Sequence, residues 1–335
     1  MPTRIPLILG AGSFGVPNTD TTRIHTLPEA QAVVDRFLSY GQNGIDTSRS
    51  YGHGTSEEFL GKLDLHGSLV DTKISPLEPG AFAPDKIRAS FQASLKALGP
   101  HKIRVLYLHY PDRSDKHVPF EDTLREINEL HKSGQIQEFG LSNFFAWEVA
   151  EFVGIARANG WVQPTVYQGR YNALERTIEA ELIPCLRKYG IRFYAYSPLA
   201  GGLLVGRNIS DDGVVDAPGS RWDPTASSIA PLFYKLYGPM LPVLKELKDV
   251  ADKHGIKLAE MAQRWLQHHS ALGPDDGVLL GVSNVGHVDA NIKDSEGGPL
   301  PDDALKLLDD AWAKAMSLAP LYGKRRILLV VVLHS

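Results

Sequence analysis

The sequence predicts an α/β protein whose fold is a (β/α)8 TIM barrel, and three observations support this prediction. Short apolar runs alternate along the chain with segments whose apolar residues recur every three or four positions, the pattern of strands followed by amphipathic helices. Several helical segments end at a glycine, and the next apolar run usually follows directly. Eight such runs can be counted in 335 residues, and barrels of this kind often exceed ~250 residues as one domain.

The eight strands are expected along nearly the whole chain. They are expected at residues 5 to 9, 44 to 48, 69 to 75, 103 to 109, 135 to 141, 165 to 168, 191 to 196 and 278 to 281. A doubly wound open sheet is the main alternative, because it also alternates strands and helices. Its dinucleotide-binding fingerprint is missing, since "GAGSFG" is not followed directly by a helix. We therefore favour a single barrel domain over residues 1 to 322.

The helices carry recognisable start and stop signals. One segment starts at Pro84, keeps its apolar residues on one face and stops at Gly99, where a left-handed cap costs little. The same ending recurs at Gly134, Gly190 and Gly255. A shorter helix is expected to begin near Thr55, with Glu58 completing a capping box.

Composition and charge indicate small-molecule chemistry. The net charge is -4 and there is no long run of Lys or Arg, so the sequence offers no footprint for nucleic acid or an anionic membrane. The single cysteine, Cys185, rules out an internal disulfide and lies at a helical core spacing. The apolar run near the N-terminus is too short for a signal peptide. We expect a cytoplasmic monomer or homodimer that acts on a small molecule.

The end of the sequence, residues 323 to 335, differs in character from the rest. It contains seven consecutive apolar residues, Ile327 to Leu333, far fewer than the ~20 that span a bilayer. Uncharged β-branched runs are typical of aggregation-prone segments. We expect this tail to lie outside the catalytic fold, and the alternative is a final strand packed on the barrel.

Four reactive side chains follow three neighbouring strands of the expected barrel. They are Asp46, Tyr51, Lys73 and His109. Active sites of such barrels lie at the carboxyl ends of the strands, so these groups are expected to converge. Each has an ordinary alternative when taken singly: a helix cap, packing at the rim, a solvated charge or a core histidine. Together they make chemical sense, because an ammonium lowers the pKa of a neighbouring phenol, and a buried ammonium needs a carboxylate.

The motifs around these residues resemble those of the aldo-keto reductases. The matching segments include "GIDTSRSYGHGTSEEFLG", "VDTKIS", "LYLHYPD", "GLSNF", "YQGRYN" and "AYSPLAGGLL", in order from about residue 5 to about 320. The sequence is most similar to the aflatoxin-aldehyde reductase-like branch, through "SRW", "FYKLYG" and "GVSN". The resemblance implies a barrel that binds NADPH and reduces an aldehyde or ketone to an alcohol. It also implies that Tyr51 donates the proton, Lys73 lowers its pKa, Asp46 pairs with Lys73, and His109 orients and polarises the carbonyl.

The same resemblance implies a set of cofactor contacts. Ser142, Asn143 and Gln168 would bind the nicotinamide carboxamide, Tyr196 would stack on its ring, Ser197, Leu199, Gly201 and Leu203 would lie near the pyrophosphate, and Gly281, Ser283, His287 and Asn291 would bind the adenosine end. His287 replaces the family's usual Arg or Gln, and Gly281 stands where some branches carry Lys, which weakens the case for tight 2′-phosphate binding. Arg221 and Lys235 are further candidates for phosphate contacts. The alternatives are a helix cap for Ser142 and Asn143, core packing for Tyr196, a plain loop after it, and solvated loop cations.

Substrate identity and two rival functions stay open at this point. Phe14, Tyr110, Phe144, Trp222 and Tyr237 are candidates to line an apolar pocket or to pack loops. A class I aldolase would use Lys73 as a Schiff base, but would not need Tyr51 and "GLSN" together. A regulatory subunit would keep the fold and the cofactor with negligible turnover.

Overall fold

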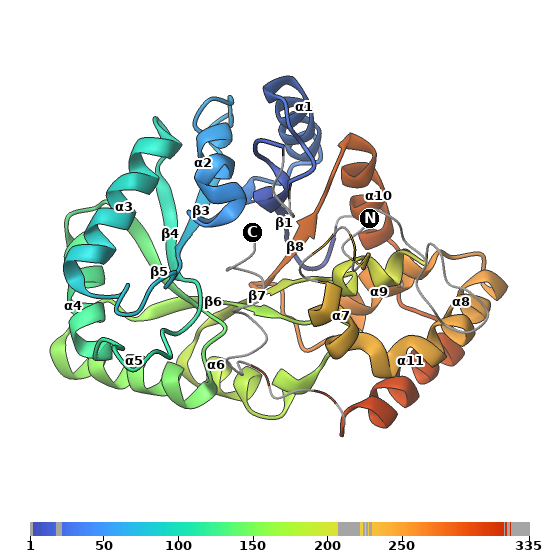
Figure 1. Ribbon diagram of the computed structural model, residues 1–335. Coiled ribbons are helices and arrows are strands. Elements are labelled where there is room, and N and C mark those ends of the chain that lie inside the picture. Colours follow the sequence, from blue (N-terminus) through green and yellow to red (C-terminus); the bar gives the residue numbers. More distant parts are fainter. Residues whose placement is uncertain are drawn as a thin grey trace.

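Eight parallel strands close into a barrel in the computed structural model of the chain (Figure 1). The structure describes residues 3–17, 22–206, 222–223, 225, 227, 230–317, 319 and 322. The strands are β1 Leu7–Gly10, β2 Gly44–Asp46, β3 Leu69–Ile74, β4 Ile103–Leu108, β5 Ile136–Ser142, β6 Pro164–Arg170, β7 Arg192–Tyr196 and β8 Gly277–Gly281. They neighbour one another in chain order, and β8 pairs with β1. The predicted TIM barrel and its eight strands are confirmed.

Helices surround the barrel and connect its strands (Figure 1). The α-helices are α1 Leu27–Leu38, α2 Thr55–Leu60, α3 Pro84–Leu98, α4 Phe120–Lys132, α5 Ala146–Asn159, α6 Leu182–Tyr189, α7 Ala230–Tyr237, α8 Leu244–Lys253, α9 Leu258–His268, α10 Val285–Ser295 and α11 Asp302–Ala315. Short 3-10 helices are η1 Ala11–Ser13, η2 Tyr51–Gly54, η3 Thr177–Glu179, η4 Ala200–Val205 and η5 Gly238–Val243. The predicted glycine endings are confirmed, since Gly99, Gly134, Gly190 and Gly255 all have positive φ after a helix.

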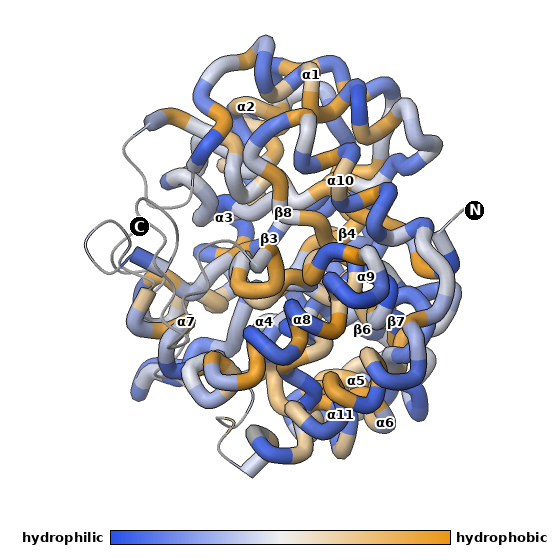
Figure 2. The backbone as a smooth tube through the Cα atoms, turned by 90° about the vertical axis from the view of Figure 1, so that its right-hand side faces the viewer, coloured by the Kyte–Doolittle hydropathy of each residue, from blue (hydrophilic) through white to orange (hydrophobic). Residues whose placement is uncertain are grey.

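Two apolar clusters hold this arrangement together. The smaller cluster comes from strands alone and, by strand alternation, fills the barrel: Ile8, Val105, Tyr107, Val166, Tyr194 and Leu279. The larger cluster joins the outward-facing strand residues to the helices. The helices are correspondingly amphipathic, and along them the tube in Figure 2 alternates between hydrophobic and hydrophilic residues.

The start of α2 differs from the prediction. Its N-cap is Gly54 rather than Thr55, and no side chain caps it. Gly52, His53 and Gly54 all have positive φ, so the chain turns sharply before the helix and Thr55 is already helical. The Thr55 hydroxyl instead donates to the carbonyl of Gly52 at 2.6 Å. The predicted capping box of Thr55 and Glu58 is therefore wrong.

Two sequence predictions concern residues outside this description. Arg221 and the tail at residues 323–335 are not among the described residues. Within the described part of the chain, no helix is both long enough and apolar enough to cross a membrane.

Candidate active site

The four reactive side chains predicted from the sequence lie together at the carboxyl ends of β2, β3 and β4. Asp46 ends β2, and Tyr51 begins η2 after a short loop. Lys73 lies in β3, and His109 follows β4. The Lys73 Nζ atom is 2.5 Å from Asp46 Oδ2 and 5.0 Å from the centre of the Tyr51 ring. The Tyr51 and His109 rings meet edge to face, with centroids 5.6 Å apart. One acid, one phenol, one ammonium and one imidazole thus form a single cluster.

The ion pair of Lys73 and Asp46 is buried, and both members make further hydrogen bonds. The Lys73 side chain is 0% exposed and that of Asp46 is 2% exposed. Lys73 also donates to the Thr47 carbonyl at 2.8 Å, and Gln168 Nε2 donates to Asp46 Oδ1 at 2.8 Å. Burial lowers the pKa of Lys73, but the negative charges of Asp46 and of ionised Tyr51 outweigh it and raise that pKa overall. Lys73 is therefore a permanent cation beside the phenol at neutral pH.

A second network, which sequence reasoning missed, holds the loop that carries Tyr51. Arg49 Nη1 donates to Glu57 Oε2 at 2.8 Å, and Thr72 Oγ1 donates to Glu57 Oε1 at 2.6 Å. The guanidinium passes over Gly54, where an added Cβ would lie 1.5 Å from Arg49 Nη2. The positive φ of Gly54 favours glycine, and a side chain there would displace the Arg49 guanidinium from its place. These contacts link the loop of Tyr51 to α2 and β3.

The environment of His109 keeps its ring neutral. Burial lowers the pKa of His109 well below its usual value, and the charge of Lys73 lowers it further. Its Nδ1 atom lies 2.7 Å from Ser75 Oγ and 3.2 Å from Ser48 Oγ. Neutral imidazole carries one proton, so one ring nitrogen donates and the other accepts.

The residues predicted to hold the nicotinamide lie next to this cluster. Asn143 Nδ2 donates to Ser142 Oγ at 2.8 Å and to the His109 carbonyl at 2.9 Å. Tyr196 donates its phenolic proton to Asn143 Oδ1 at 2.8 Å, and Gln168 contacts Asp46 as described. Neither Ser142 nor Asn143 caps a helix, because the N-cap of α5 is Phe145. The four side chains therefore form a polar group continuous with Asp46 and His109.

The residues predicted to lie near the pyrophosphate follow Tyr196 at the end of β7, and they differ in solvent exposure. Ser197, Leu199 and Gly201 are partly exposed, and Leu203 is buried in the core. Ser197 and Gly201 have positive φ. A Cβ at Gly201 would lie 2.7 Å from the Phe233 ring, so packing against α7 already requires glycine there. The glycine at position 201 is thus explained by packing, whether or not a pyrophosphate also binds there.

The residues predicted for the adenosine end lie where β8 leads into α10. Ser283 Oγ is 3.0 Å from His287 Nδ1, and Gly281 is exposed at the end of β8. Asn291 is buried: its amide donates to the His287 carbonyl at 2.7 Å and accepts from Gln263 at 3.0 Å. The bond from Gln263 ties α10 to α9, whereas the bond to the His287 carbonyl stays within α10. Lys235 is exposed on α7.

The five aromatic candidates for a substrate pocket are mostly core residues. Phe14, Phe144 and Tyr237 are fully buried, and Trp222 packs against Phe233 with centroids 5.5 Å apart. Tyr110 touches the catalytic cluster, with its ring centroid 5.4 Å from that of His109.

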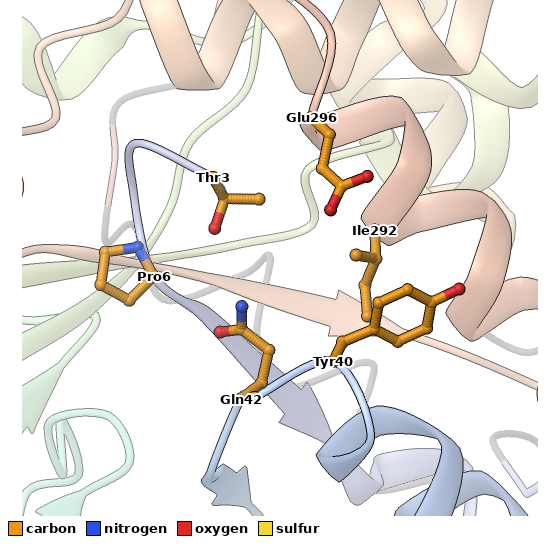
Figure 3. A pocket seen from close by; sticks show the side chains of 7 residues that line it. Thr3, Pro6, Tyr40, Gln42, Ile292 and Glu296 are labelled. Atoms are coloured by element: carbon orange, nitrogen blue, oxygen red, sulfur yellow. The ribbon is translucent and has the colours of Figure 1, made fainter. Parts of the chain in front are cut away.

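A cavity of about 310 Å³ lies at the other end of the barrel (Figure 3). It is lined by Thr3, Pro6, Tyr40, Gly41, Gln42, Ile292 and Glu296. Pro6 precedes β1, and Tyr40 and Glu296 follow α1 and α10, so this cavity is at the amino ends of the strands. It contains none of the reactive cluster and is a separate feature.

Comparison with known proteins agrees with the class that this barrel and its strand-end cluster indicate. The chain belongs to the aldo/keto reductase family, whose sequence profile matches residues 6–313. It is therefore an oxidoreductase, and the resemblance noted in its motifs is confirmed.

Individual relatives refine this family assignment. The chain is 39% identical over 306 residues to aflatoxin B1 aldehyde reductase member 2 of Mus musculus, covering 87% of this chain and 82% of the mouse protein. It is 39% identical over 320 residues to aflatoxin B1 aldehyde reductase member 4 of Homo sapiens, covering 91% and 93%. The solved structure of a glycerol dehydrogenase from Gluconobacter oxydans superposes with a TM-score of 0.70 at 26% identity, covering 94% of this chain and 93% of that chain.

Proposed function

We propose that this protein uses NADPH to reduce an aldehyde or a ketone to an alcohol, with Tyr51 as the proton donor. The observation that carries this proposal is the buried pair of Lys73 and Asp46 beside the Tyr51 ring. A phenol is a weak acid at neutral pH, with an ordinary pKa near ~10, and a fixed ammonium stabilises the phenolate left after proton transfer. The names of the mammalian relatives, which are aldehyde reductases, support the same reaction class.

Each member of the cluster has a separate role in this proposal. Tyr51 protonates the oxygen that becomes negatively charged during reduction, and Lys73 makes that transfer easier. Asp46 holds Lys73 charged and in place. His109, being neutral, orients the carbonyl by a hydrogen bond and adds no charge that would compete with Lys73.

The polar group beside the cluster fits the nicotinamide of the cofactor. A carboxamide needs both donors and acceptors, and Ser142, Asn143 and Gln168 provide hydroxyl and amide groups in one place. Tyr196 is fixed by its hydrogen bond to Asn143 and offers a flat face for stacking. NADPH, when bound, supplies the hydride for the reaction. Cytoplasmic location and a monomeric or dimeric state stay predictions.

Two rival functions are distinguished by one assay each. A Schiff-base aldolase needs a neutral lysine, whereas the pKa of Lys73 is raised and its ammonium is hydrogen-bonded to Asp46 and Thr47. Failure of borohydride with substrate to trap Lys73 would set that rival aside. Oxidation of NADPH with a panel of aromatic and medium-chain aldehydes tests the proposal directly, and cofactor binding without turnover would favour the regulatory subunit.

The preference for NADPH over NADH is expected to be moderate and to depend on His287, Arg221 or both. A histidine is mostly neutral above its unperturbed pKa of ~6.5, while the 2′-phosphate has a second pKa near ~6. Acidification therefore protonates the histidine but removes part of the negative charge of the 2′-phosphate. The preference for NADPH should be greatest at a pH between these two pKa values. The measurement is KM for both cofactors from about pH 5.5 to 8.5, in the parent, His287→Ala and Arg221→Ala. If the ratio of KM for NADPH to KM for NADH is unchanged in both variants, then other residues bind the 2′-phosphate, or none does.

We propose that residues 1 to 322 are one catalytic domain and that the tail is dispensable. The Tyr322 hydroxyl lies 3.4 Å from that of Tyr167 and 3.5 Å from Asn143 Oδ1, so the chain still contacts the site at this point. Truncation after Gly323 keeps Tyr322 and removes the apolar run, and it should preserve kcat and improve solubility. The full chain, assayed in parallel, is the control. Loss of folding on truncation would instead show that the tail is structural.

A further inference from the structure

We propose that Ser75, supported by Ser50 and Ser48, is a positioning residue that keeps the single proton of His109 on its Nε2 atom. The three serines form a hydroxyl cluster on the Nδ1 side of the ring. The inference rests on the proposed function, because it gives His109 the donor that a carbonyl oxygen requires.

The hydroxyl cluster is assembled from the ends of consecutive strands. Ser48 and Ser50 lie between β2 and Tyr51, Ser75 follows β3 directly, and His109 follows β4. Ser75 Oγ is 2.7 Å from His109 Nδ1 and 3.0 Å from Ser50 Oγ. Ser48 Oγ is 3.2 Å from the same nitrogen, 3.0 Å from Ser50 Oγ and 3.3 Å from the Lys73 carbonyl.

The acceptors available to each hydroxyl decide where its proton goes. Ser48 can donate to the carbonyl oxygen of Lys73, and Ser50 can donate to Ser48. Ser75 has two acceptors within reach, the imidazole nitrogen at 2.7 Å and the Ser50 oxygen at 3.0 Å. An imidazole nitrogen is the more basic of the two, and its contact is the shorter. Ser75 therefore donates to Nδ1, and the proton of the neutral ring is on Nε2, away from the cluster.

The opposite arrangement places a proton in every contact of the chain, whereas donation from Ser75 to Nδ1 leaves the contact between Ser75 and Ser50 without one. The contact between Ser75 and Ser50 has a geometry suited to Ser75 as donor. If Ser75 donates to Ser50, then Nδ1–H donates to Ser75. Ser50 in turn donates to Ser48, and Ser48 donates to the Lys73 carbonyl. Nε2 would then present a lone pair, which repels the oxygen of a carbonyl substrate. The two arrangements differ in which ring nitrogen is protonated.

Hydroxyls suit this position for an electrostatic reason. A carboxylate at Nδ1 would hold a proton there and stabilise the imidazolium form. The hydroxyl cluster fixes one tautomer without adding charge, so the ring remains a neutral donor beside the ammonium of Lys73. The Nζ atom of Lys73 donates to Asp46 and Thr47 rather than to His109.

The test is the ¹⁵N spectrum of His109, which distinguishes the two tautomers and requires no turnover. The chain has 12 histidines, so the signal is assigned by its loss in His109→Ala. The parent and Ser75→Thr, which keeps the hydroxyl, should show the proton on Nε2. Ser75→Ala should show a mixture of tautomers, and Ser50→Ala a smaller change. A parent spectrum with the proton on Nδ1, or an unchanged tautomer in Ser75→Ala, would overturn the inference.

Kinetics provide the second measurement and separate this inference from the proposed function. Loss of one hydrogen bond is worth about ten-fold at most, so kcat in Ser75→Ala should fall about ten-fold. The Kd of NADPH should be unchanged, and Ser75→Thr should restore kcat. A parent protein that reduces no carbonyl compound but has the Nε2 tautomer contradicts the proposed function alone. An active parent whose Ser75→Ala variant keeps the full kcat contradicts the role of Ser75 alone.

Discussion

Replacement of Tyr51 by phenylalanine is expected to remove most of the reductase rate while leaving NADPH binding intact. The variant keeps the ring beside Lys73 and His109 but loses the proton that the product alcohol requires. Loss of a general acid typically costs ~10²-fold or more in rate. The residues proposed to hold the nicotinamide, Asn143 and Gln168, make their own hydrogen bonds without Tyr51.

The measurement pairs kcat for a good aldehyde with the Kd of NADPH from protein fluorescence. Tyr110→Phe is the matched control, because this neighbouring phenol also touches His109 but burial raises its pKa. The control should keep a rate close to that of the parent. A Tyr51→Phe variant that reduces the aldehyde at the parent rate would show that the proton comes from elsewhere.

Replacement of Lys73 by methionine should abolish activity and also destabilise the fold. In this variant the charge of the buried Asp46 is no longer compensated. Of the two side chains that donate to Asp46, Lys73 and Gln168, only Gln168 remains. Removing one member of a buried ion pair typically costs about 3 to 5 kcal/mol in the free energy of unfolding. Replacing both members by apolar residues of similar size is often neutral, so Asp46→Leu combined with Lys73→Met should recover stability but not activity.

Urea unfolding of the parent, the single variant and the double variant tests this expectation. The folded-state pKa of Lys73 is raised, so its contribution to stability is fully present below its unfolded pKa of ~10.4 and is lost as pH rises through the folded value. The measurement at neutral pH therefore sees the whole effect. A single variant within about 1 kcal/mol of the parent, together with a double variant no more stable, would mean that the buried pair does not hold the site together.

The sequence was most informative where local patterns decide the structure. Periodicity predicted every strand, and terminal glycines predicted the ends of four helices, because burial of one face and a positive φ leave clear traces. The convergence of Asp46, Tyr51, Lys73 and His109 followed from the rule that parallel strands end at one face. The capping box at Thr55 failed because three successive positive φ values move the helix start by one residue.

Other features leave no local trace in the sequence. Arg49, Glu57 and Thr72 lie on three different elements, and no pattern in the sequence connects them before the fold brings them together. The hydroxyl cluster at His109 is similar, since serines are common in loops and only its distances give it meaning. The structural role of Asn291 is a further example: its buried amide is bonded at both ends within the protein, and its contact with a cofactor stays a prediction.

The hydrogen bond from Gln168 to Asp46 has a consequence for how the molecule folds. It joins residues 122 positions apart, and β2 and β6 are four strands from each other in either direction around the barrel. Lys73 and Asp46 can pair once β2 and β3 have paired. The Oδ1 atom of Asp46 gains its hydrogen bond only when β6, which carries Gln168, has joined the barrel. Long-range contacts of this kind form late, after the entropy of closing the intervening loop has been lost. A nascent or half-folded chain would therefore hold an incomplete charge cluster, and the proposed proton donation would be available only to a closed barrel.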